Sequence, residues 1–368
     1  MTELEEQSPP AGSEGETIAI KVKRWRQRSP MWWLLPASLG ILGCTLLTGA
    51  FALGVFGNRR AAATDRPAPA VVTTGGAPPI GTLDPTAQAA GLSGTLEPGD
   101  KPITFLLMGS DRRAGDGTVG RTDSMHLVTL DADHQGIGVL SFPRDLYVNI
   151  PDHGRDRINL VYAYGSSQGG GGAALLRETF LENFGVQVDH IIYLDFSVFV
   201  TLVDKIGGID VVVPYNIDDP LYPDEEFGYD PFQLEAGLQH LDGETALKYV
   251  RTRHETNDFY RARRQQQVML AVRDRVLNFN LLPSLIPQIP SMFKTLGSGY
   301  KTDLTADQVA TLALELKNIK EEEIRMGVVD ESATLDHVTP EGASVLVPDT
   351  AKVNELIQTV LYPVDTTN

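Results

Sequence analysis

The sequence predicts an α/β fold in which helices cover a sheet, and three observations support this prediction. Short apolar runs of strand length alternate with helical segments throughout residues 101–368. Turn residues and helix-capping residues separate these segments. Neither an internal repeat nor a second linker interrupts the series, so we interpret residues 101–368 as one domain.

The individual elements follow from local patterns. Asp242 precedes one helical segment as a candidate N-cap, Thr305 and Gln308 form a capping-box pattern, and Asp349 precedes a last helix that ends near residue 361. Together with this last helix, the predicted helices cover residues 173–184, 196–206, 243–250, 258–279 and 306–318. The predicted strands cover residues 103–108, 125–130, 136–142, 146–150, 190–194, 209–213, 324–329 and 344–347.

The amino-terminal hundred residues differ from the rest. Residues 1–30 are polar and end in a basic run, and residues 31–57 contain no charged side chain. Since this apolar run is longer than a bilayer core of about 30 Å requires, we expect one transmembrane helix, with a cleaved signal peptide as the alternative. The five basic residues before the span, against two directly after it, place the amino terminus in the cytoplasm and the later residues outside it.

Residues 58–100 are rich in Pro, Ala and Gly, which predicts a disordered linker between the membrane and the folded domain. The single cysteine, Cys44, lies inside the predicted span, so the exported part has no disulfides. Residues 101–368 carry 23 basic against 39 acidic side chains, which opposes binding to nucleic acid. The seven histidines show no zinc-ligand spacing, and no P-loop or G-x-S-x-G motif is present.

One arginine-rich stretch departs from this acidic background. Five arginines fall within residues 251–264. If residues 258–279 form one helix, Arg261, Arg264 and Gln265 share a stripe with Val268, Val272 and Val276, whereas Arg263 points the other way. A solvated surface helix is the alternative, but an inward guanidinium requires an anionic partner.

Further polar residues lie at the ends of predicted strands, where α/β folds place their sites. Carboxylates and guanidiniums alternate among them, as a divalent cation together with a pyrophosphate would require. Mg²⁺ (or Mn²⁺) held by one or two carboxylates fits this pattern better than any metal that prefers Cys or His. The candidate site residues are Asp111, Arg121, Asp123, Arg144, Asp145, Arg157, Asn159, Arg251, Arg253, Arg261, Arg264 and Gln265.

An ordered series of motifs over residues 104–276 resembles the LytR-CpsA-Psr (LCP) family of cell-envelope enzymes. The motifs include FLLMGSDRR, GRTDSM, SFPRDLYV, RINLVYAYG, LDGETALKYVRTR and DFYRARRQQQV. The resemblance implies a central mixed sheet flanked by helices, with a long hydrophobic pocket for a polyprenyl tail. Residues 198, 199, 202, 203, 268, 272 and 276 could line that pocket or serve as ordinary core.

The resemblance also implies an activity. Such proteins are membrane-anchored phosphotransferases that move a phospho-glycopolymer from a polyprenyl pyrophosphate carrier to peptidoglycan. Asp111 and Asp123 then match the metal-associated aspartates, and Arg121, Arg144, Arg253 and Arg261 match arginines that contact pyrophosphate. Asp145 is the candidate general base. A polyprenyl-pyrophosphate phosphohydrolase and a non-catalytic envelope regulator are the alternatives.

Overall fold

The computed structural model describes residues 99, 101–111, 120–167, 169, 171–224, 228–253 and 257–363. All of them fall within one compact unit, Thr74–Asn368. The predicted cytoplasmic tail, the predicted span and nearly all of the predicted linker lie outside the described residues. Among the residues that are described, no helix combines the length and the apolar character needed to cross a bilayer.

A six-stranded mixed sheet forms the centre of this unit, as predicted, with the strand order β11, β6, β1, β2, β3, β12. β1 is antiparallel to β2 and parallel to β6, and β3 is antiparallel to β2 and parallel to β12. The edge strand β11 is antiparallel to β6. The strands span Ile103–Ser110 (β1), Thr122–Leu130 (β2), Ile137–Ser141 (β3), His190–Asp195 (β6), Tyr300–Thr302 (β11) and Ile324–Val328 (β12).

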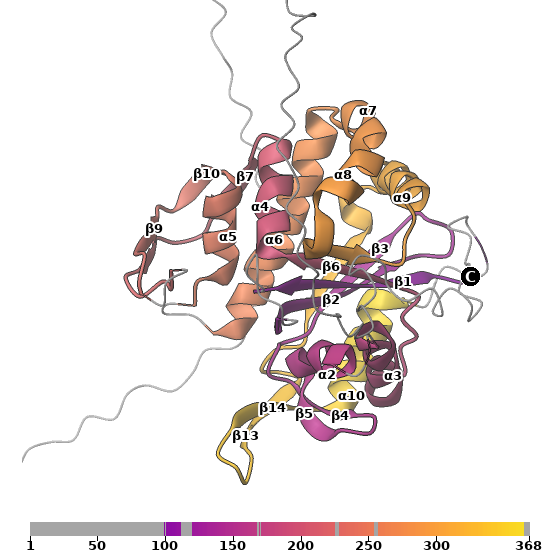
Figure 1. Cartoon of the computed structure of the whole chain (residues 1–368), viewed down its shortest axis with the longest axis vertical. Coiled ribbons are helices and arrows are strands. Elements are labelled where there is room, and N and C mark those ends of the chain that lie inside the picture. The colour runs from indigo at the N-terminus through magenta and orange to yellow at the C-terminus, as the bar shows by residue number, and fades with distance from the viewer. Residues whose placement is uncertain are drawn as a thin grey trace, which may run out of the picture. The chain divides into compact units, whose positions relative to one another are not determined.

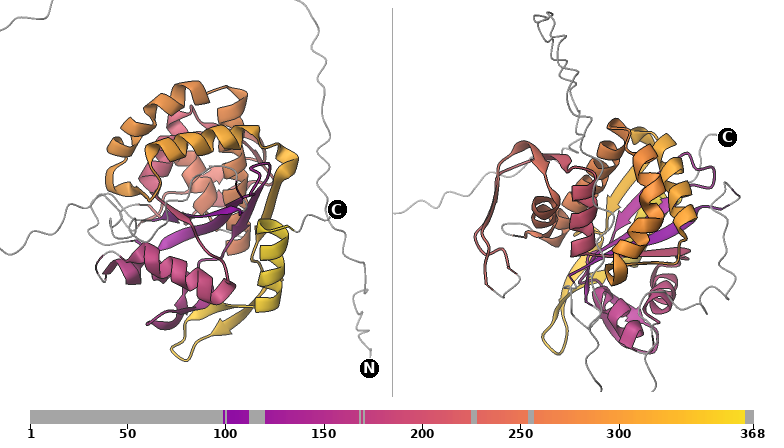
Figure 2. Two further views of the ribbon diagram at one scale, coloured as in Figure 1. Left: turned by 90° about the vertical axis from the view of Figure 1, so that its right-hand side faces the viewer. Right: turned by 45° about the horizontal axis from the view of Figure 1, so that its top comes forward.

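One face of the sheet packs into the main hydrophobic core. Leu106 on β1 and Leu127 on β2 are fully buried there, together with Phe180 of one helix and Val353 of another. The helices on this side are α2 (Val161–Ser167), α3 (Gly172–Phe184) and α10 (Thr350–Leu356), and a π-helical turn, Ile357–Leu361, continues α10. Figures 1 and 2 show this layer below the sheet.

The opposite face of the sheet carries the alternate residues. Leu107 lies opposite both His126 and Ile192 across the neighbouring strands, and Gly109 lies opposite Ser124. Figures 1 and 2 show five further helices on this side of the sheet. They are α4 (Phe196–Lys205), α6 (Asp258–Asn278), α7 (Leu282–Leu285), α8 (Ile289–Thr295) and α9 (Ala306–Asn318).

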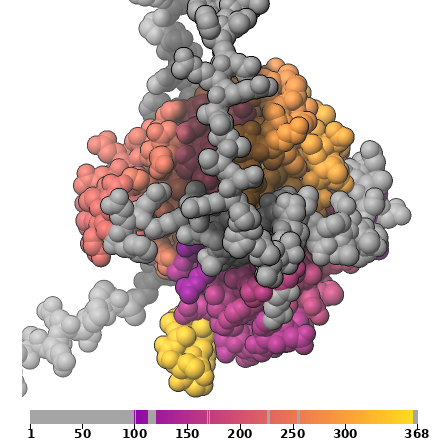
Figure 3. Space-filling view, in the orientation of Figure 1, coloured from indigo at the N-terminus to yellow at the C-terminus, as the bar shows by residue number. Residues whose placement is uncertain are grey.

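A second hydrophobic core joins α4 and α6 to a smaller antiparallel pair, β7 (Ile209–Val213) with β10 (Gly237–Leu241), and to α5 (Gly243–Arg251). Asp242 caps α5 by accepting a hydrogen bond from the Thr245 amide at 2.8 Å, as predicted. Two more pairs are β4 (Tyr147–Ile150) with β5 (Gly154–Arg157) and β8 (Ile217–Asp219) with β9 (Phe232–Leu234). The hairpin β13 (Thr334–Val338) with β14 (Ser344–Pro348) projects from the surface in Figures 1 and 3.

The long helices begin where the sequence predicts them. The Thr305 side chain accepts from the Gln308 amide and the Gln308 side chain accepts from the Thr305 amide, which completes the capping box of α9. Asp349 caps α10, and Asn257 caps α6 by accepting from the amides of residues 259 and 260. The sequence-based assignment missed β5, β8, β9, β10, β11, β13, α2, α7 and α8.

Candidate active site

A pocket of about 850 Å³ lies between the sheet face that carries Leu107 and the helices α4, α6, α7 and α8. β1 and β2 form its floor, and α4 and α6 form its walls. Its apolar part includes Phe199, Leu202, Val203, Val268, Val272 and Val276, as the sequence suggested. Val198, which was considered with them, is buried but is not one of the lining residues.

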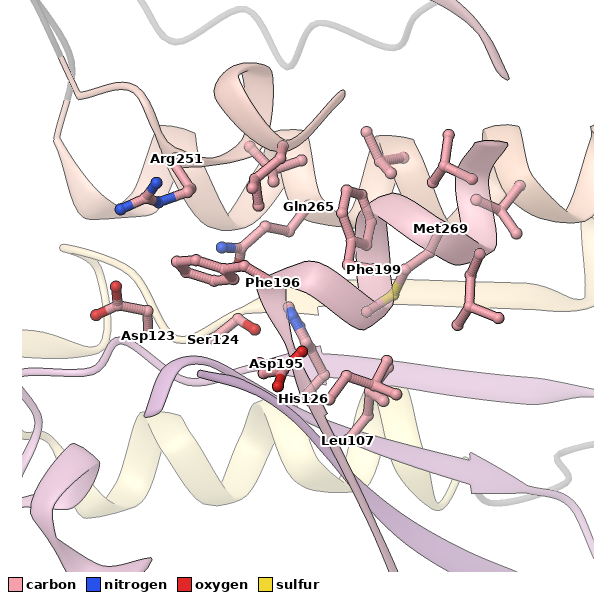
Figure 4. A pocket seen from close by; sticks show the side chains of 18 of the residues that line it. Leu107, Asp123, Ser124, His126, Asp195, Phe196, Phe199, Arg251, Gln265 and Met269 are labelled. Atoms are coloured by element: carbon pink, nitrogen blue, oxygen red, sulfur yellow. The ribbon is translucent and has the colours of Figure 1, made fainter. Parts of the chain in front are cut away.

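The pocket is polar at one end and apolar at the other. In Figure 4, Asp123 and Arg251 lie toward one end and Met269 toward the other, with His126 between them. α6 contributes to both ends, because Arg261 lies in its first turn and Val276 in its last. A ligand that fits this pocket therefore has an anionic head and a long apolar tail.

Gly109 keeps the floor open near the polar end. A Cβ atom at this position would lie 2.4 Å from the Ser124 hydroxyl oxygen, so only glycine allows the serine side chain to lie across β1. The pairing of the two strands shifts between Gly109 and Ser110, which marks a local irregularity at the same point.

Three arginines surround one carboxylate at the polar end. Asp258 accepts a hydrogen bond from Arg261 Nη2 at 3.2 Å, and its side chain is 15 % exposed. Its two oxygens also lie 3.5 Å from Arg253 Nη1 and 3.6 Å from Arg144 Nε. Asp258 therefore holds together guanidiniums from three separate segments of the chain.

Arg261 is the most deeply placed of these arginines. Only 5 % of its surface is exposed, and its Nη2 also donates to the Asp123 carbonyl oxygen at 3.3 Å. Burial lowers the pKa of Arg261 to about 10, although Asp258 opposes the shift. A guanidinium whose charge is this poorly solvated gains strongly from a bound anion.

Arg144 is tied to Asp123, one of the two candidate metal ligands. Its Nη1 donates to Asp123 Oδ1 at 2.7 Å. Burial alone would lower the pKa of Arg144, but the carboxylates of Asp123, Asp258 and Asp145 raise it above its ordinary value. Asp123 Oδ2 has no hydrogen bond or ion pair with the residues that the structure describes.

Asp111 lies near enough to Asp123 for the charges of the two carboxylates to interact. Burial raises the pKa of Asp111, the negative charge of Asp123 raises it further, and the charges of Arg251 and Arg121 oppose the shift. A divalent cation would relieve this repulsion between two carboxylates. No group of three or more His, Cys, Asp or Glu side chains with metal-binding geometry occurs in the described part of the chain, so this pair would need phosphate oxygens and water as the remaining ligands.

Arg251 and Arg253 leave the end of α5 on either side of Thr252, and both line the pocket. The Arg251 guanidinium lies 4.4 Å from the centre of the Phe196 ring and donates to the Tyr222 hydroxyl at 3.0 Å. Arg253 is 43 % exposed at the mouth of the site. Together they extend the cationic wall from the pocket interior to its entrance.

The structure separates Arg264 from the pocket. Arg264 is buried, as its place on the inward stripe predicted, but its Nη2 donates to the Thr252 carbonyl oxygen and its guanidinium lies 5.7 Å from the Tyr249 ring centre. The Thr252 hydroxyl in turn donates to Asp219 Oδ2 at 2.5 Å. Arg264 is therefore placed to fix the turn between Arg251 and Arg253, whereas its predicted contact with the ligand has no support in this geometry.

Asp145, Arg157 and Asn159 lie behind Arg144. Asp145 contacts Arg157 Nε at 3.3 Å and Arg144 Nε at 3.5 Å through its two oxygens, and none of the three candidates lines the pocket. Arg157 also donates to the Ser344 carbonyl oxygen at 2.8 Å, and Asn159 is buried beside the Thr122 hydroxyl. These contacts support Arg144. Both oxygens of Asp145 pair with guanidiniums, and its role as a base stays a prediction.

Arg263 and Gln265 occupy the positions that helical periodicity assigns to them. Arg263 is 46 % exposed and pairs with Asp330 at 2.8 Å, away from the pocket. Gln265 lines the pocket, and Figure 4 shows its side chain between Arg251 and His126. The charge of the exposed Arg121 opposes the rise in the pKa of Asp111 that burial and Asp123 cause.

Sequence reasoning missed several residues at this site. Asp258 is not among the candidate site residues of the sequence analysis, although its i,i+3 spacing from Arg261 indicates the pair. His126 was set aside with the other histidines, and its role depends on strand register that the sequence does not state. Phe196 and Tyr222 carried no signal, because aromatic residues at such positions usually pack in a core.

Comparisons with known proteins agree with this architecture. The family model described as the LytR_cpsA_psr family matches residues 82–360. The Bacillus subtilis protein named polyisoprenyl-teichoic acid--peptidoglycan teichoic acid transferase TagT is 32% identical over 213 residues, which is 57% of this chain and 62% of that protein. The Staphylococcus aureus protein named regulatory protein MsrR is 32% identical over 196 residues, 53% of this chain and 55% of that protein.

A solved structure shares the fold as well. The structure described as LytR-CPS2A-psr family protein YwtF (TagT) with bound octaprenyl pyrophosphate lipid, from Bacillus subtilis, has a TM-score of 0.50 and 25% sequence identity. The match covers 73% of this chain and 94% of that one. The two curated relatives above match this chain over less than two thirds of their own lengths. Because the family model covers most of the chain, including every candidate site residue, this protein belongs to the LytR_cpsA_psr family.

Proposed function

We propose that this chain transfers a phospho-glycopolymer from a polyprenyl pyrophosphate carrier to peptidoglycan and forms a phosphodiester link. The observation that carries the proposal is one continuous pocket, with buried and half-buried arginines at one end and aliphatic side chains at the other. A polyprenyl pyrophosphate has the same division between an anionic head and an apolar tail. The name of the B. subtilis relative and the lipid bound to the similar structure support this choice of ligand.

The reaction is a displacement at phosphorus. A peptidoglycan hydroxyl oxygen bonds to the phosphorus next to the glycopolymer and loses its proton to a base. The bond from that phosphorus to the bridging oxygen breaks, and its electron pair leaves with polyprenyl phosphate. Arg144, Arg253 and Arg261 would offset the charge that develops on the leaving phosphate, which is the main protein contribution in phosphoryl transfer.

Asp111 and Asp123 are the residues that would hold Mg²⁺ (or Mn²⁺). The repulsion between the two carboxylates fits a cation of this kind, as does Asp123 Oδ2, which pairs with no other group in the described part of the chain. Such an ion would neutralise phosphate oxygens and orient the pyrophosphate. We expect a chelator to abolish transfer by the full-length protein and Mg²⁺ to restore it. Full activity after complete removal of divalent cations would contradict this assignment.

The proposed topology follows from the amino-terminal sequence. Residues 1–30 form a cytoplasmic tail, 31–57 a single span of the cell membrane, and 58–100 a linker, so that the domain 101–368 works outside the cytoplasm. Its partners are then the lipid-linked glycan and the peptidoglycan acceptor, without nucleic acid. Protease treatment of intact cells that removes the domain but spares an amino-terminal tag tests this arrangement.

The decisive assay mixes the full-length protein in detergent with a lipid-pyrophosphate-linked glycan, Mg²⁺ and peptidoglycan oligomers. Mass spectrometry of the oligomers should detect a phosphodiester-linked glycan. The Arg261→Ala variant should lose transfer by at least about 10²-fold, whereas Arg263→Ala on the other side of the same helix should keep it.

The alternatives give different products in this assay. A hydrolase would release glycan phosphate without a coupled product, using the same arginine cluster. A regulator without catalytic activity, as the name of the S. aureus relative suggests for that protein, would give neither product. Either result with a correctly folded preparation of the wild-type chain rejects the transferase.

A further inference from the structure

His126 lies on the pocket floor at the boundary between the polar and the apolar ends. It points from β2 to the same side of the sheet as Leu107 and Ser124, and only 2 % of its surface is exposed. Figure 4 shows its ring between Asp123 and Met269 along the pocket. A buried polar ring at the edge of the apolar part of the pocket needs hydrogen-bond partners, which calls for an explanation.

A chain of hydrogen bonds holds the other side of this ring. The Gln266 side-chain nitrogen donates to the Gly327 carbonyl oxygen at 2.6 Å and to the Ser141 hydroxyl oxygen at 2.8 Å. The Ser141 hydroxyl lies 2.7 Å from His126 Nδ1. A carbonyl oxygen only accepts, so the Gln266 amide is oriented, and its second hydrogen occupies one lone pair of Ser141.

This arrangement selects one tautomer of His126. Ser141 has one hydroxyl hydrogen to donate, and His126 Nδ1 is its only hydrogen-bond acceptor in the part of the chain that the structure describes. Nδ1 is therefore an acceptor, and the ring hydrogen is on Nε2. Burial and the nearby Arg261 lower the pKa of His126 to about 4, so the ring is neutral and carries one hydrogen at pH 7.

We infer that the His126 Nε2–H group is a further ligand-binding donor, which binds an oxygen of the phosphate that is attached to the lipid. This inference rests on the proposed function and deepens it. Arg261 lines the same pocket and its charge acts on the His126 ring, so a phosphate that Arg261 attracts would lie near His126. A neutral N–H donor fixes the orientation of the phosphate through a directional hydrogen bond. It does so without the free-energy cost of burying a second cation beside the apolar tail.

The donor also defines where the head of the ligand ends. A phosphate that slid deeper would lose Arg253 and Arg261, and one that sat higher would lose His126 Nε2. An aliphatic residue at position 126 would accept the tail at any depth. His126 therefore sets the depth of the lipid phosphate in the pocket and selects lipids that carry a phosphate at this point.

The test compares farnesyl pyrophosphate with farnesol, which has the same chain without phosphate, by calorimetry on the full-length protein in detergent. His126→Leu should bind farnesyl pyrophosphate about tenfold more weakly than the wild type and farnesol equally well. His126→Gln, which places an amide nitrogen near the Nε2 position, should restore most of the loss. His126→Asn places its nitrogen near Nδ1 and should not.

Each contrary outcome is distinct. Equal loss of both ligands in His126→Leu would assign only a packing role to His126, and unchanged affinity for farnesyl pyrophosphate would remove the donor altogether. Absence of binding by the wild-type chain would overturn both this inference and the proposed function. Binding without transfer to peptidoglycan would reject the proposed function and leave the donor assignment intact.

The tautomer can be observed without any substitution. In the wild-type protein with ¹⁵N-labelled histidine, nuclear magnetic resonance should show His126 protonated at Nε2 and bare at Nδ1, with the signal assigned through His126→Asn. The Nε2 resonance should shift on addition of farnesyl pyrophosphate and remain in place on addition of farnesol. A ring protonated at Nδ1 would contradict the hydrogen-bond chain on which the inference depends.

Discussion

Replacement of Asp258 should show whether turnover depends on the position of the three arginines as well as on their charge. Its carboxylate lies 3.2, 3.5 and 3.6 Å from Arg261, Arg253 and Arg144. At an effective dielectric constant of about 20, each contact has a gross attraction of roughly 4–5 kcal/mol. Desolvation offsets much of this, and the contact with the half-exposed Arg253 is further screened.

Asp258→Asn keeps the shape of the side chain and removes its charge. Three guanidiniums then lose the carboxylate that they share, and of the three only Arg144 keeps another close carboxylate, Asp123, among the residues that the structure describes. We expect the free energy of unfolding to fall by roughly 3 kcal/mol, as for other broken buried pairs. The turnover number should fall about 10²-fold, because displacement of catalytic groups by about 1 Å has effects of this size. The KM for the lipid substrate should not rise, since the substitution removes a negative charge beside a bound anion.

The assay combines thermal unfolding of the full-length protein with steady-state transfer kinetics. Asp330→Asn is the matched control, because Asp330 pairs with Arg263 on the other side of the same helix at 2.8 Å. This control should lose some stability and keep its turnover number. If Asp258→Asn showed the same kinetics as Asp330→Asn, Asp258 would not position the arginines.

Three more predictions follow from contacts of the site. Arg264→Met should lower the turnover number and reduce the free energy of unfolding by about 1–3 kcal/mol, because the Thr252 carbonyl oxygen loses its hydrogen-bond donor. Unchanged kinetics would contradict the role given to the turn between Arg251 and Arg253. Gly109→Ala should weaken lipid binding in a calorimetric titration, because the new Cβ atom displaces the Ser124 hydroxyl, and Ser124→Ala should relieve the effect in the double variant. The pKa of His126 is near 6.5 in the unfolded chain and about 4 in the folded chain, so the unfolded chain binds the proton first as the pH falls. The free energy of unfolding should therefore fall by about 3 kcal/mol between pH 7 and 4. Denaturant titrations of His126→Leu should lack this part of the pH dependence.

The sequence predicted the long elements well, because each has a strong local signal. The capping box at Thr305 and the 3.6-residue period of residues 258–279 marked two helices that the structure confirms. The strands of β8 and β9 have only three residues each, which is too short for a period to be recognised. Their existence depends on pairing between segments that are distant in the sequence.

The site was predicted in part for the same reason. Periodicity placed both Arg261 and Arg264 inward, and both are buried. It could not distinguish the arginine that lines the pocket from the one that supports a turn, because this depends on where Thr252 and Tyr249 lie in space. The role of His126 depends on the contacts of Ser141 and Gln266, which belong to two other elements, and no local pattern contains that information.

The continuity of α6 has a consequence for how this chain can change in length. The helix presents Arg261 to one end of the pocket and Val276 to the other, and each residue turns the helix by about 100°. Insertion or deletion of a single residue between these positions would rotate one end against the other and expose either the arginines or the valines. Length variation is therefore excluded within this helix and permitted only in the segments that flank it.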